Sequence, residues 1–187
     1  SSFAIFPSFF VEEKKNAELT SGGRRFQLSL FLAFLILSVL SIYFYNLKPL
    51  KAGINLIKFK RAAKPTQELM NRVLEKTPYV DIMRTHLANI IFLDIKDYEV
   101  LKWAAPSIIR ELEFSKANHQ QDFSFPFLLG NLHLLGGDYE QSLESYKTAL
   151  KISPNRQGLM FQMATSYIFN NQADEAIKIL KTASNLN

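Results

Sequence analysis

Residues 26–45 form an uninterrupted apolar run, FQLSLFLAFLILSVLSIYFY, with no charged residue, proline or glycine. A helix of roughly 20 apolar residues is needed to cross the hydrocarbon core of a bilayer, and this run has that length. Arg24 and Arg25 precede the run, and Lys48 and Lys51 follow it. The run therefore predicts a transmembrane helix over residues 26–45, which would hold the rest of the chain at a membrane surface.

A buried helix of a soluble protein and a secretory signal fit this run less well. A soluble helix keeps a polar stripe, whereas few residues here are clearly polar. A signal peptide has a shorter apolar core, followed closely by a cleavage site of small residues. This run instead ends in Tyr43, Phe44 and Tyr45, which is typical of the aromatic belt at a membrane interface.

The formal net charge of +5 is unevenly distributed along the 187 residues. Residues 1–65 carry ten basic and three acidic residues and sum to +7, so residues 66–187 sum to −2. Phosphate binding requires clustered lysine and arginine, so no nucleic-acid partner is expected for the C-terminal part. The chain contains no cysteine, which excludes disulfides and thiolate metal sites.

Residues 1–25 comprise a short apolar segment and a polar loop. Residues 3–11 are too few to span a bilayer alone, and they fit either the end of a preceding transmembrane helix or a disordered stub. The chain starts at Ser1 without an initiator methionine. We interpret it as the C-terminal piece of a longer protein or as a processed form.

Residues 46–65 are strongly basic and predict a juxtamembrane helix. Pro49 fits a first helical turn, and Leu50, Ile54 and Ile57 fall on one helical face. One interpretation is a helix that lies in the membrane plane and holds anionic headgroups. The other is a plain connector whose charges set topology. The candidate headgroup contacts are Lys48, Lys51, Lys58, Lys60, Arg61 and Lys64.

From residue 66 onward the sequence predicts helices and no sheet. Thr77-Pro78 has the form of a cap followed by proline at the first helical position, and Asp97 is a second candidate cap. Pro106 lies inside a helical stretch and predicts a kink or a break. We therefore expect an all-α protein, with a transmembrane helix followed by helical hairpins over residues 66–187.

A pattern of small, large and helix-ending residues marks residues 123–154. Gly130 would let two paired helices approach closely, and Gly137 would end the first helix in a left-handed conformation. Tyr146 and Ala149 form a large–small pair for the neighbouring helix, and Pro154 stops the second helix. The pattern resembles a tetratricopeptide repeat, a 34-residue helix-turn-helix unit. The resemblance implies an α-α solenoid of tetratricopeptide-like hairpins.

The pattern recurs 34 residues later, with Ala164 in the place of Gly130 and Ala183 in the place of Ala149. A third, degenerate unit precedes these two. Asp97 corresponds to Asp138 at a spacing of 41 residues, and we expect the seven extra residues in the loop around residues 118–124. The same register places Asn89 in the slot of Gly130.

The sequence contains no recognisable catalytic or metal site. The three histidines lack the spacing of a metal site on a helix, and His119 falls in a polar loop where exposure is expected. Asp94, Asp97 and Glu99 cluster at a helix junction, where capping and solvation are expected rather than acid–base catalysis. We predict no catalytic residue, no metal and no cofactor for this chain.

The resemblance implies a binding function instead, because tetratricopeptide stacks present a concave surface lined by their first helices. An apolar groove there would take a peptide or helix of a protein partner. Alternatively, the units stack only on one another. The repeat register selects as groove residues Phe127, Asn131, Leu134, Phe161, Thr165 and Ile168.

The order of features along the chain is also informative. An apolar tail and charged loop come first, then a span ending in Tyr43, a basic helix that begins NLKPLKA over residues 46–52, and degenerate repeats. This order resembles the C-terminal end of bacterial O-antigen ligase/polymerase-type membrane proteins. The resemblance implies a parent enzyme of polysaccharide biosynthesis, whose catalytic loop is absent here. The alternative is a stand-alone membrane-tethered scaffold for an envelope complex.

The basic flanks of the apolar run predict its orientation in a bacterial inner membrane. Residues 48–64 hold six bases, against four in residues 14–25. The positive-inside rule then places the repeat domain in the cytoplasm.

Overall fold

The computed structural model describes residues 26–75 and 79–186, and every regular element within these ranges is helical. Residues 1–25 and the Thr77-Pro78 cap lie outside the described residues. The chain divides into two compact units, Ser1–Lys48 and Pro49–Asn187, and each is described by itself.

In the first unit, residues 26–42 are α-helical and continue into a π-helical turn, η1 (Tyr43–Leu47). All side chains of residues 26–47 are exposed. Among the described residues one helix, Phe26–Arg61, is long and apolar enough to cross a membrane, with a mean hydropathy of 2.3 over an 18-residue window. This finding rests on length and composition, so the membrane crossing itself stays a prediction.

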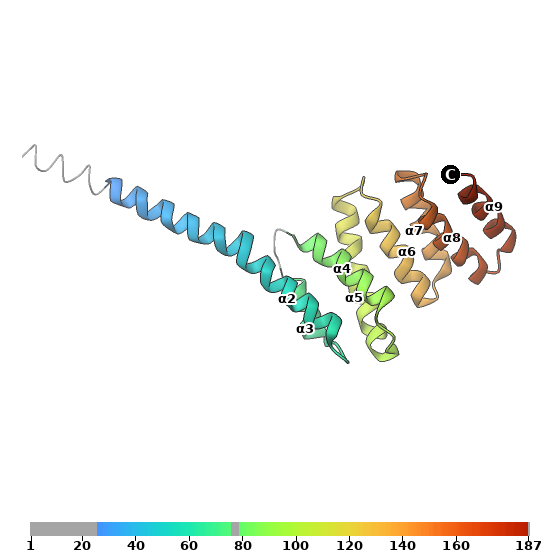
Figure 1. Ribbon diagram of the computed structural model, residues 1–187, viewed down its shortest axis with the longest axis horizontal. Helices are drawn as coiled ribbons and strands as arrows, with labels where there is room; N and C mark the ends of the chain where they lie inside the picture. The colour runs from blue at the N-terminus through green and yellow to red at the C-terminus, as the bar shows by residue number, and fades with distance from the viewer. Residues whose placement is uncertain (1–25, 76–78, 187) are drawn as a thin grey trace, which may run out of the picture. The chain divides into compact units, whose positions relative to one another are not determined.

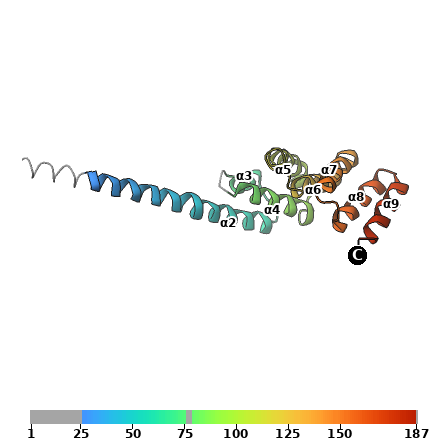
Figure 2. The same cartoon turned by 90° about the horizontal axis from the view of Figure 1, so that it is seen from above.

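The second unit contains eight of the described helices, which follow one another as antiparallel pairs from α4 onward (Figures 1 and 2). Helices that are consecutive in sequence pack together from α4 to α9, and α4 also packs against α6. We call α4, α6 and α8 the first helices, and α5, α7 and α9 the second helices. The predicted all-α repeat architecture is confirmed. The bounds are α2 (Lys48–Arg61), α3 (Gln67–Val73), α4 (Val80–Leu93), α5 (Tyr98–Asn118), α6 (Ser124–Gly136), α7 (Tyr139–Ile152), α8 (Gln157–Phe169) and α9 (Ala173–Ser184).

The α6–α7 hairpin confirms the predicted role of each pattern residue. A Cβ on Gly130 would lie closer than 3.0 Å to three atoms of the fully buried Tyr146 ring, so only glycine fits there. Gly137 ends α6 with a φ of 79°, in the left-handed region. Ala149 is fully buried, and α7 ends two residues before Pro154.

The α8–α9 hairpin repeats this packing, with alanine at the predicted small positions. Ala164 and Ala183 are buried, as is Ala176 in the place of Ser142. Asn171 takes the left-handed conformation between the helices, with a φ of 57°. Asparagine is one of the few residues besides glycine that tolerates this region.

The α4–α5 hairpin exists as predicted, but the extra residues were placed wrongly. They lengthen the second helix, because α5 has 21 residues where α7 has 14. Pro106 lies inside α5 without splitting it. The register is also wrong in the first helix, since Asn89 is exposed and its neighbour Ala88 is fully buried. The connecting loop also differs, because it spans four residues, 94–97, against two in the next hairpin.

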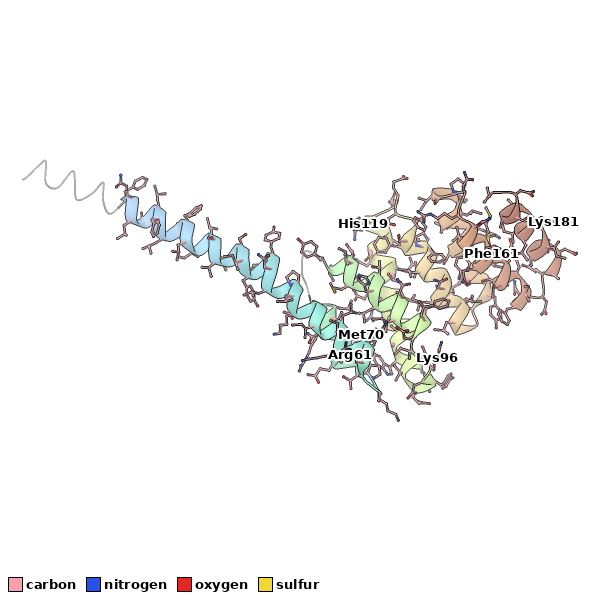
Figure 3. The ribbon with its side chains drawn as sticks, viewed as in Figure 1. Arg61, Met70, Lys96, His119, Phe161 and Lys181 are labelled. Carbon is pink, nitrogen blue, oxygen red and sulfur yellow. The ribbon has the colours of Figure 1, made fainter. Side chains whose placement is uncertain are left out.

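The basic segment after the apolar run contributes to the core of the second unit. Phe59 of α2 is fully buried and belongs to one apolar cluster with Met70 of α3 and Leu87 of α4. Asn55 Nδ2 donates a hydrogen bond to the Arg72 carbonyl oxygen at 3.5 Å. Helices α2 and α3 therefore cover the N-terminal end of the repeats. Figure 3 labels Arg61 and Met70 in this region.

Candidate partner-binding surface

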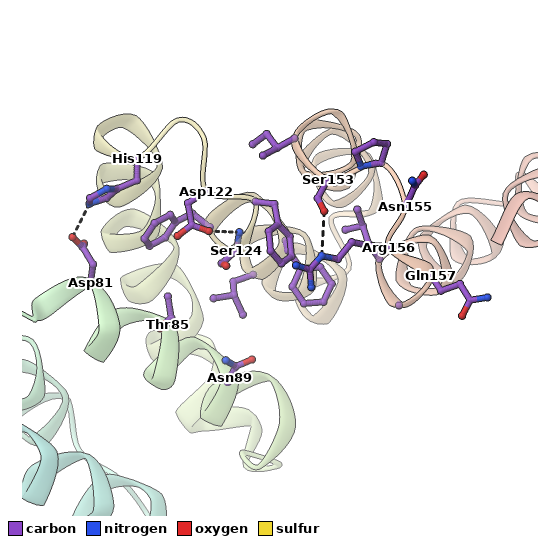
Figure 4. Close-up of a pocket in the computed structure, with 18 of the residues that line it drawn as sticks. Asp81, Thr85, Asn89, His119, Asp122, Ser124, Ser153, Asn155, Arg156 and Gln157 are labelled. Carbon is purple, nitrogen blue, oxygen red and sulfur yellow. Dashed lines mark hydrogen bonds and ion pairs between the residues drawn. The ribbon is translucent and has the colours of Figure 1, made fainter. Parts of the chain in front are cut away.

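A groove of about 1160 Å³ crosses the N-terminal parts of the three first helices (Figure 4). Ile82 and Thr85 of α4 form one wall, Phe125 and Phe127 of α6 form the floor, and the α7–α8 loop forms the other wall. Because consecutive first helices point the same way in a repeat stack, their N-terminal ends meet along one edge of the domain. The groove therefore follows from the repeat topology.

Arg156 is the basic residue of the groove. Its Cζ atom lies 4.0 Å from the centroid of the Phe123 ring, and its Nε donates a hydrogen bond to Ser153 Oγ at 3.1 Å. A guanidinium stacked on an aromatic face keeps its remaining N–H groups available for a carboxylate. This end of the groove therefore suits an acidic group of a ligand.

The opposite end of the groove is acidic. Asp81 Oδ2 lies 3.0 Å from His119 Nε2, and the His119 ring stacks on Phe125 with centroids 5.6 Å apart. Asp122 Oδ1 accepts a hydrogen bond from the amide of Ser124, the first residue of α6, at 2.9 Å. The His119 side chain is 49% exposed, as its position in a polar loop predicts. The groove thus has a basic end at Arg156 and an acidic end at Asp81 and Asp122.

A polar cluster joins α4 to α5 beside the acidic end. The Arg84 guanidinium donates to Asp81 Oδ1 at 2.7 Å and to Glu111 Oε2 at 2.7 Å and 3.0 Å. Ser115 Oγ, which is fully buried, donates to Asp81 Oδ1 at 2.5 Å. Burial raises the pKa of Asp81, but hydrogen bonds from Ser115, Arg84 and His119 outweigh it and hold this pKa below its ordinary value. We call these four residues, Asp81, Arg84, Glu111 and Ser115, the Arg84 cluster.

The Arg84 cluster lacks the geometry of a nucleophilic site. Ser115 bonds to the carboxylate of Asp81 rather than to His119, and its hydroxyl is buried away from any substrate. An activated serine needs a base within hydrogen-bond reach and access to the reacting group. The cluster therefore holds two helices together. Among residues 26–75 and 79–186, no group of three or more potential ligands is arranged to hold a metal ion.

The six residues predicted to line the groove have different environments. Phe127 lines the groove just described, but Asn131 is buried and accepts a hydrogen bond from the Tyr146 hydroxyl at 2.7 Å. Leu134 and Thr165 are half-buried. Phe161, labelled in Figure 3, is 49% exposed, and Ile168 is also exposed. The structure thus brings one predicted residue to the groove and leaves two apolar side chains exposed on α8.

The six predicted headgroup contacts also have different environments. Lys60 Nζ forms an ion pair with Asp94 Oδ2 at 3.2 Å, and Lys48 Nζ lies 5.5 Å from the centroid of the Phe44 ring. The remaining bases are exposed: Lys51, Lys58, Arg61 and Lys64. Their role at a lipid surface stays a prediction.

Sequence reasoning missed Arg156 and Asp81 as groove residues. Arg156 directly precedes α8, and its place in the loop between two repeats was a usable signal, since loops at one edge of a solenoid gather together. The pairing of Asp81 with His119 spans 38 residues and has no periodic signature. Only the packing of α4 against α5 brings these two side chains together.

Comparison with known proteins identifies the repeat type. The profile of the tetratricopeptide repeat family matches residues 133–187. Two solved structures of MamA AMB-1 superpose with TM-scores of 0.51 and 0.50, at 24% sequence identity. Both matches cover 64% of this chain and 66% of the MamA chain, slightly less than two thirds of its length. No curated protein sequence matches the chain. At this identity the likeness shows the fold alone, which is a tetratricopeptide-type helical repeat.

Proposed function

We propose that this chain is a membrane-anchored tetratricopeptide-type module that binds an extended segment of a protein partner across its first helices. The groove of about 1160 Å³ carries the proposal, because it runs over three first helices and offers an apolar floor with opposite charges at its ends. Such a site would fix both the position and the direction of a bound peptide.

The exposed apolar residues of the first helices support this proposal against simple stacking. Ile82 lines the groove and is 50% exposed, and Phe161 and Ile168 of α8 are exposed beyond it. If the hairpins served only to pack on one another, these positions would carry polar residues without cost to the core. A partner that covers them would remove apolar area from water, which favours association.

Cross-linking from single positions tests the partner site. A photo-reactive amino acid replaces Phe161 or Ile82 in cells, with Lys147 on the exposed face of α7 as the matched control. We expect a discrete cross-linked band from the two first-helix positions and none from position 147. Equal yields from all three positions, or none from positions 82 and 161, would refute the first helices as the binding surface.

The anchor belongs to the same proposal and rests on the apolar run and its basic flanks. The chain would sit in a bacterial inner membrane with the repeats in the cytoplasm. Because the chain has no cysteine, a single cysteine in place of exposed Asn185 reports the side directly. We expect no labelling by an impermeant thiol reagent until the cells are opened. Labelling of intact cells would place the repeats outside.

The parent of the module has two candidates. The order of features favours the C-terminal tail of an O-antigen ligase/polymerase-type protein, and a stand-alone scaffold of an envelope complex is the alternative. The sequence upstream of Ser1 in the gene distinguishes them. Several spans with a long outer loop would support the ligase tail, whereas a start codon shortly before Ser1 would support the scaffold.

A further inference from the structure

Helix α2 has two opposite apolar faces, and the repeat domain uses one of them. Ala52, Asn55 and Phe59 are buried in the second unit, at spacings of three and four residues. This spacing defines one side of a helix. The buried face fixes α2 as the first layer of the core, so the helix cannot rotate to hide its other side.

The opposite side of α2 carries a second apolar stripe, which is exposed among the described residues. Leu50, Ile54 and Ile57 are 61%, 45% and 54% exposed. They recur at spacings of four and three residues, and Arg61 continues the stripe four residues later. At about 100° per residue these positions lie roughly opposite Ala52, Asn55 and Phe59. A helix with two apolar sides is expected to pack against a second apolar environment.

The charges beside the stripe have one sign. Helix α2 contains no acidic residue. Lys60 pairs with Asp94 on the side facing α4. Lys51 and Lys58 are exposed at the other margin of the stripe, and in the part of the chain that the structure describes no carboxylate pairs with them or with Arg61. The surface therefore combines aliphatic side chains with a net positive charge.

We propose that the exposed stripe of α2, formed by Leu50, Ile54, Ile57 and Arg61, rests on an anionic lipid surface. Aliphatic side chains would enter the boundary between headgroups and acyl chains, while Lys51, Lys58 and Arg61 contact lipid phosphates. Charge complementarity favours lipid over a protein partner. The stripe begins five residues after the apolar run of residues 26–45, and because residues 26–61 form one helix, the contact requires a bend at the π-helical turn η1. This inference rests on the membrane anchor proposed above and adds the second lipid contact.

The test uses the intact chain in lipid nanodiscs, because the absence of native cysteine allows a single label. One variant is Ile54→Cys, and the matched control is Ile177→Cys on α9, since isoleucine 177 is 50% exposed. Both carry an environment-sensitive fluorophore. In discs with a third of anionic lipid we expect at least about a twofold lower iodide quenching constant at position 54 than in detergent. We expect no such change at position 177.

Charge variants show whether the anionic headgroups are responsible. In the Ile54→Cys background, Lys51→Gln, Lys58→Gln and Arg61→Gln together should abolish the difference in quenching between anionic and zwitterionic discs. The control removes the same charge from exposed lysines elsewhere, with Lys147→Gln, Lys151→Gln and Lys181→Gln. The control should keep the full difference in quenching between anionic and zwitterionic discs, because the negative surface potential acts only on bases near the lipid.

Three outcomes overturn the inference. Quenching at position 54 that is the same in anionic discs, zwitterionic discs and detergent would make α2 a plain connector. Protection that already exists in detergent and grows with protein concentration would assign the stripe to a second copy of the chain. Protection that survives the triple substitution would remove the role of charge. Failure of the anchor is distinct, because the chain would then not co-elute with the discs at all.

Discussion

The α4–α5 and α6–α7 hairpins have the same topology but are held together by different forces. In α6–α7 the two helices are held by close steric packing, because the Tyr146 ring lies directly against Gly130. Ser142 Oγ, also buried, donates to the Gly130 carbonyl oxygen at 2.9 Å. The α4–α5 hairpin contains no glycine, and its corresponding link is the ionic Arg84 cluster.

The difference shows how a repeat can lose its pattern and keep its fold. Close approach of two helices needs a small residue at the crossing; in the degenerate unit Ala88 is a buried small residue of the first helix, and the second helix is longer. The seven additional residues of α5 include Ser115, whose Oγ donates a hydrogen bond to Asp81 of α4, whereas Glu111 lies at the last position that α7 also has. The additional helix length thus adds one buried hydroxyl to the Arg84 cluster.

Gly130→Leu should have the largest effect, because it places side-chain atoms where the Tyr146 ring lies. Overpacking a fully buried contact typically costs about 2–3 kcal/mol in the free energy of unfolding. Urea unfolding followed by circular dichroism measures the loss. Gly158→Ala is the control, since a Cβ there meets nothing within 4 Å. If both variants unfold at the same urea concentration, the regular hairpin is not held together by shape.

Arg84→Met should come next, because it leaves Asp81 and Glu111 half-buried without their cation. Breaking a fully buried ion pair costs about 3–5 kcal/mol, and partial exposure of these carboxylates reduces the expected cost to about 2 kcal/mol. The control is Arg72→Met, which removes an exposed pair with Glu68 at 2.6 Å. That control should lose less than about 0.5 kcal/mol. Equal losses would show that the Arg84 cluster contributes no more than a surface pair.

The smallest expected effect is a pH-dependent cost of mutation that occurs in the α4–α5 hairpin and not in the α6–α7 hairpin. The pKa of Asp81 is lowered in the folded state, so its contribution is present above its ordinary pKa and is lost as the pH falls below that value. The cost of Asp81→Asn, about 1 kcal/mol at pH 7 for this partly exposed group, should therefore shrink at pH 3. Urea midpoints at the two pH values measure the change.

Tyr146→Phe provides the matched comparison in the regular hairpin. It removes the hydrogen bond to Asn131, and burial raises the pKa of Tyr146 further above neutrality. Neither group titrates between pH 3 and 7, so the cost of this variant should be the same at both values. A pH-dependent cost for Tyr146→Phe would contradict the division into a neutral and an ionic hairpin.

The periodic parts of the fold were predictable from the sequence. Gly130, Gly137 and Ala149 act locally, through backbone conformation and the size of one side chain, so their spacing is enough to assign them. The position of Asp97 as a helix cap was predictable for the same reason, and its Oδ1 accepts from the Glu99 amide at 2.9 Å. The placement of the seven extra residues was not, because a helix and a loop of the same length fit the same spacing.

The candidate site was predictable only in outline. The repeat register indicated the first helices and one groove residue, Phe127. It also selected Asn131, which the structure buries against Tyr146. A register assigns a residue to a helix face, but the bonds that the residue makes depend on its neighbour in space. The acidic and basic ends of the groove come from loops that periodicity does not describe.

By itself, the sequence determined that this chain has an apolar run of membrane-spanning length and a C-terminal stack of helical hairpins. Both features follow from the spacing of residues that are close together in the sequence. The tertiary structure decided which side of α2 is buried and which partner Arg84 takes. It also decided where the groove opens, because each of these depends on side chains tens of residues apart that meet only when the helices pack.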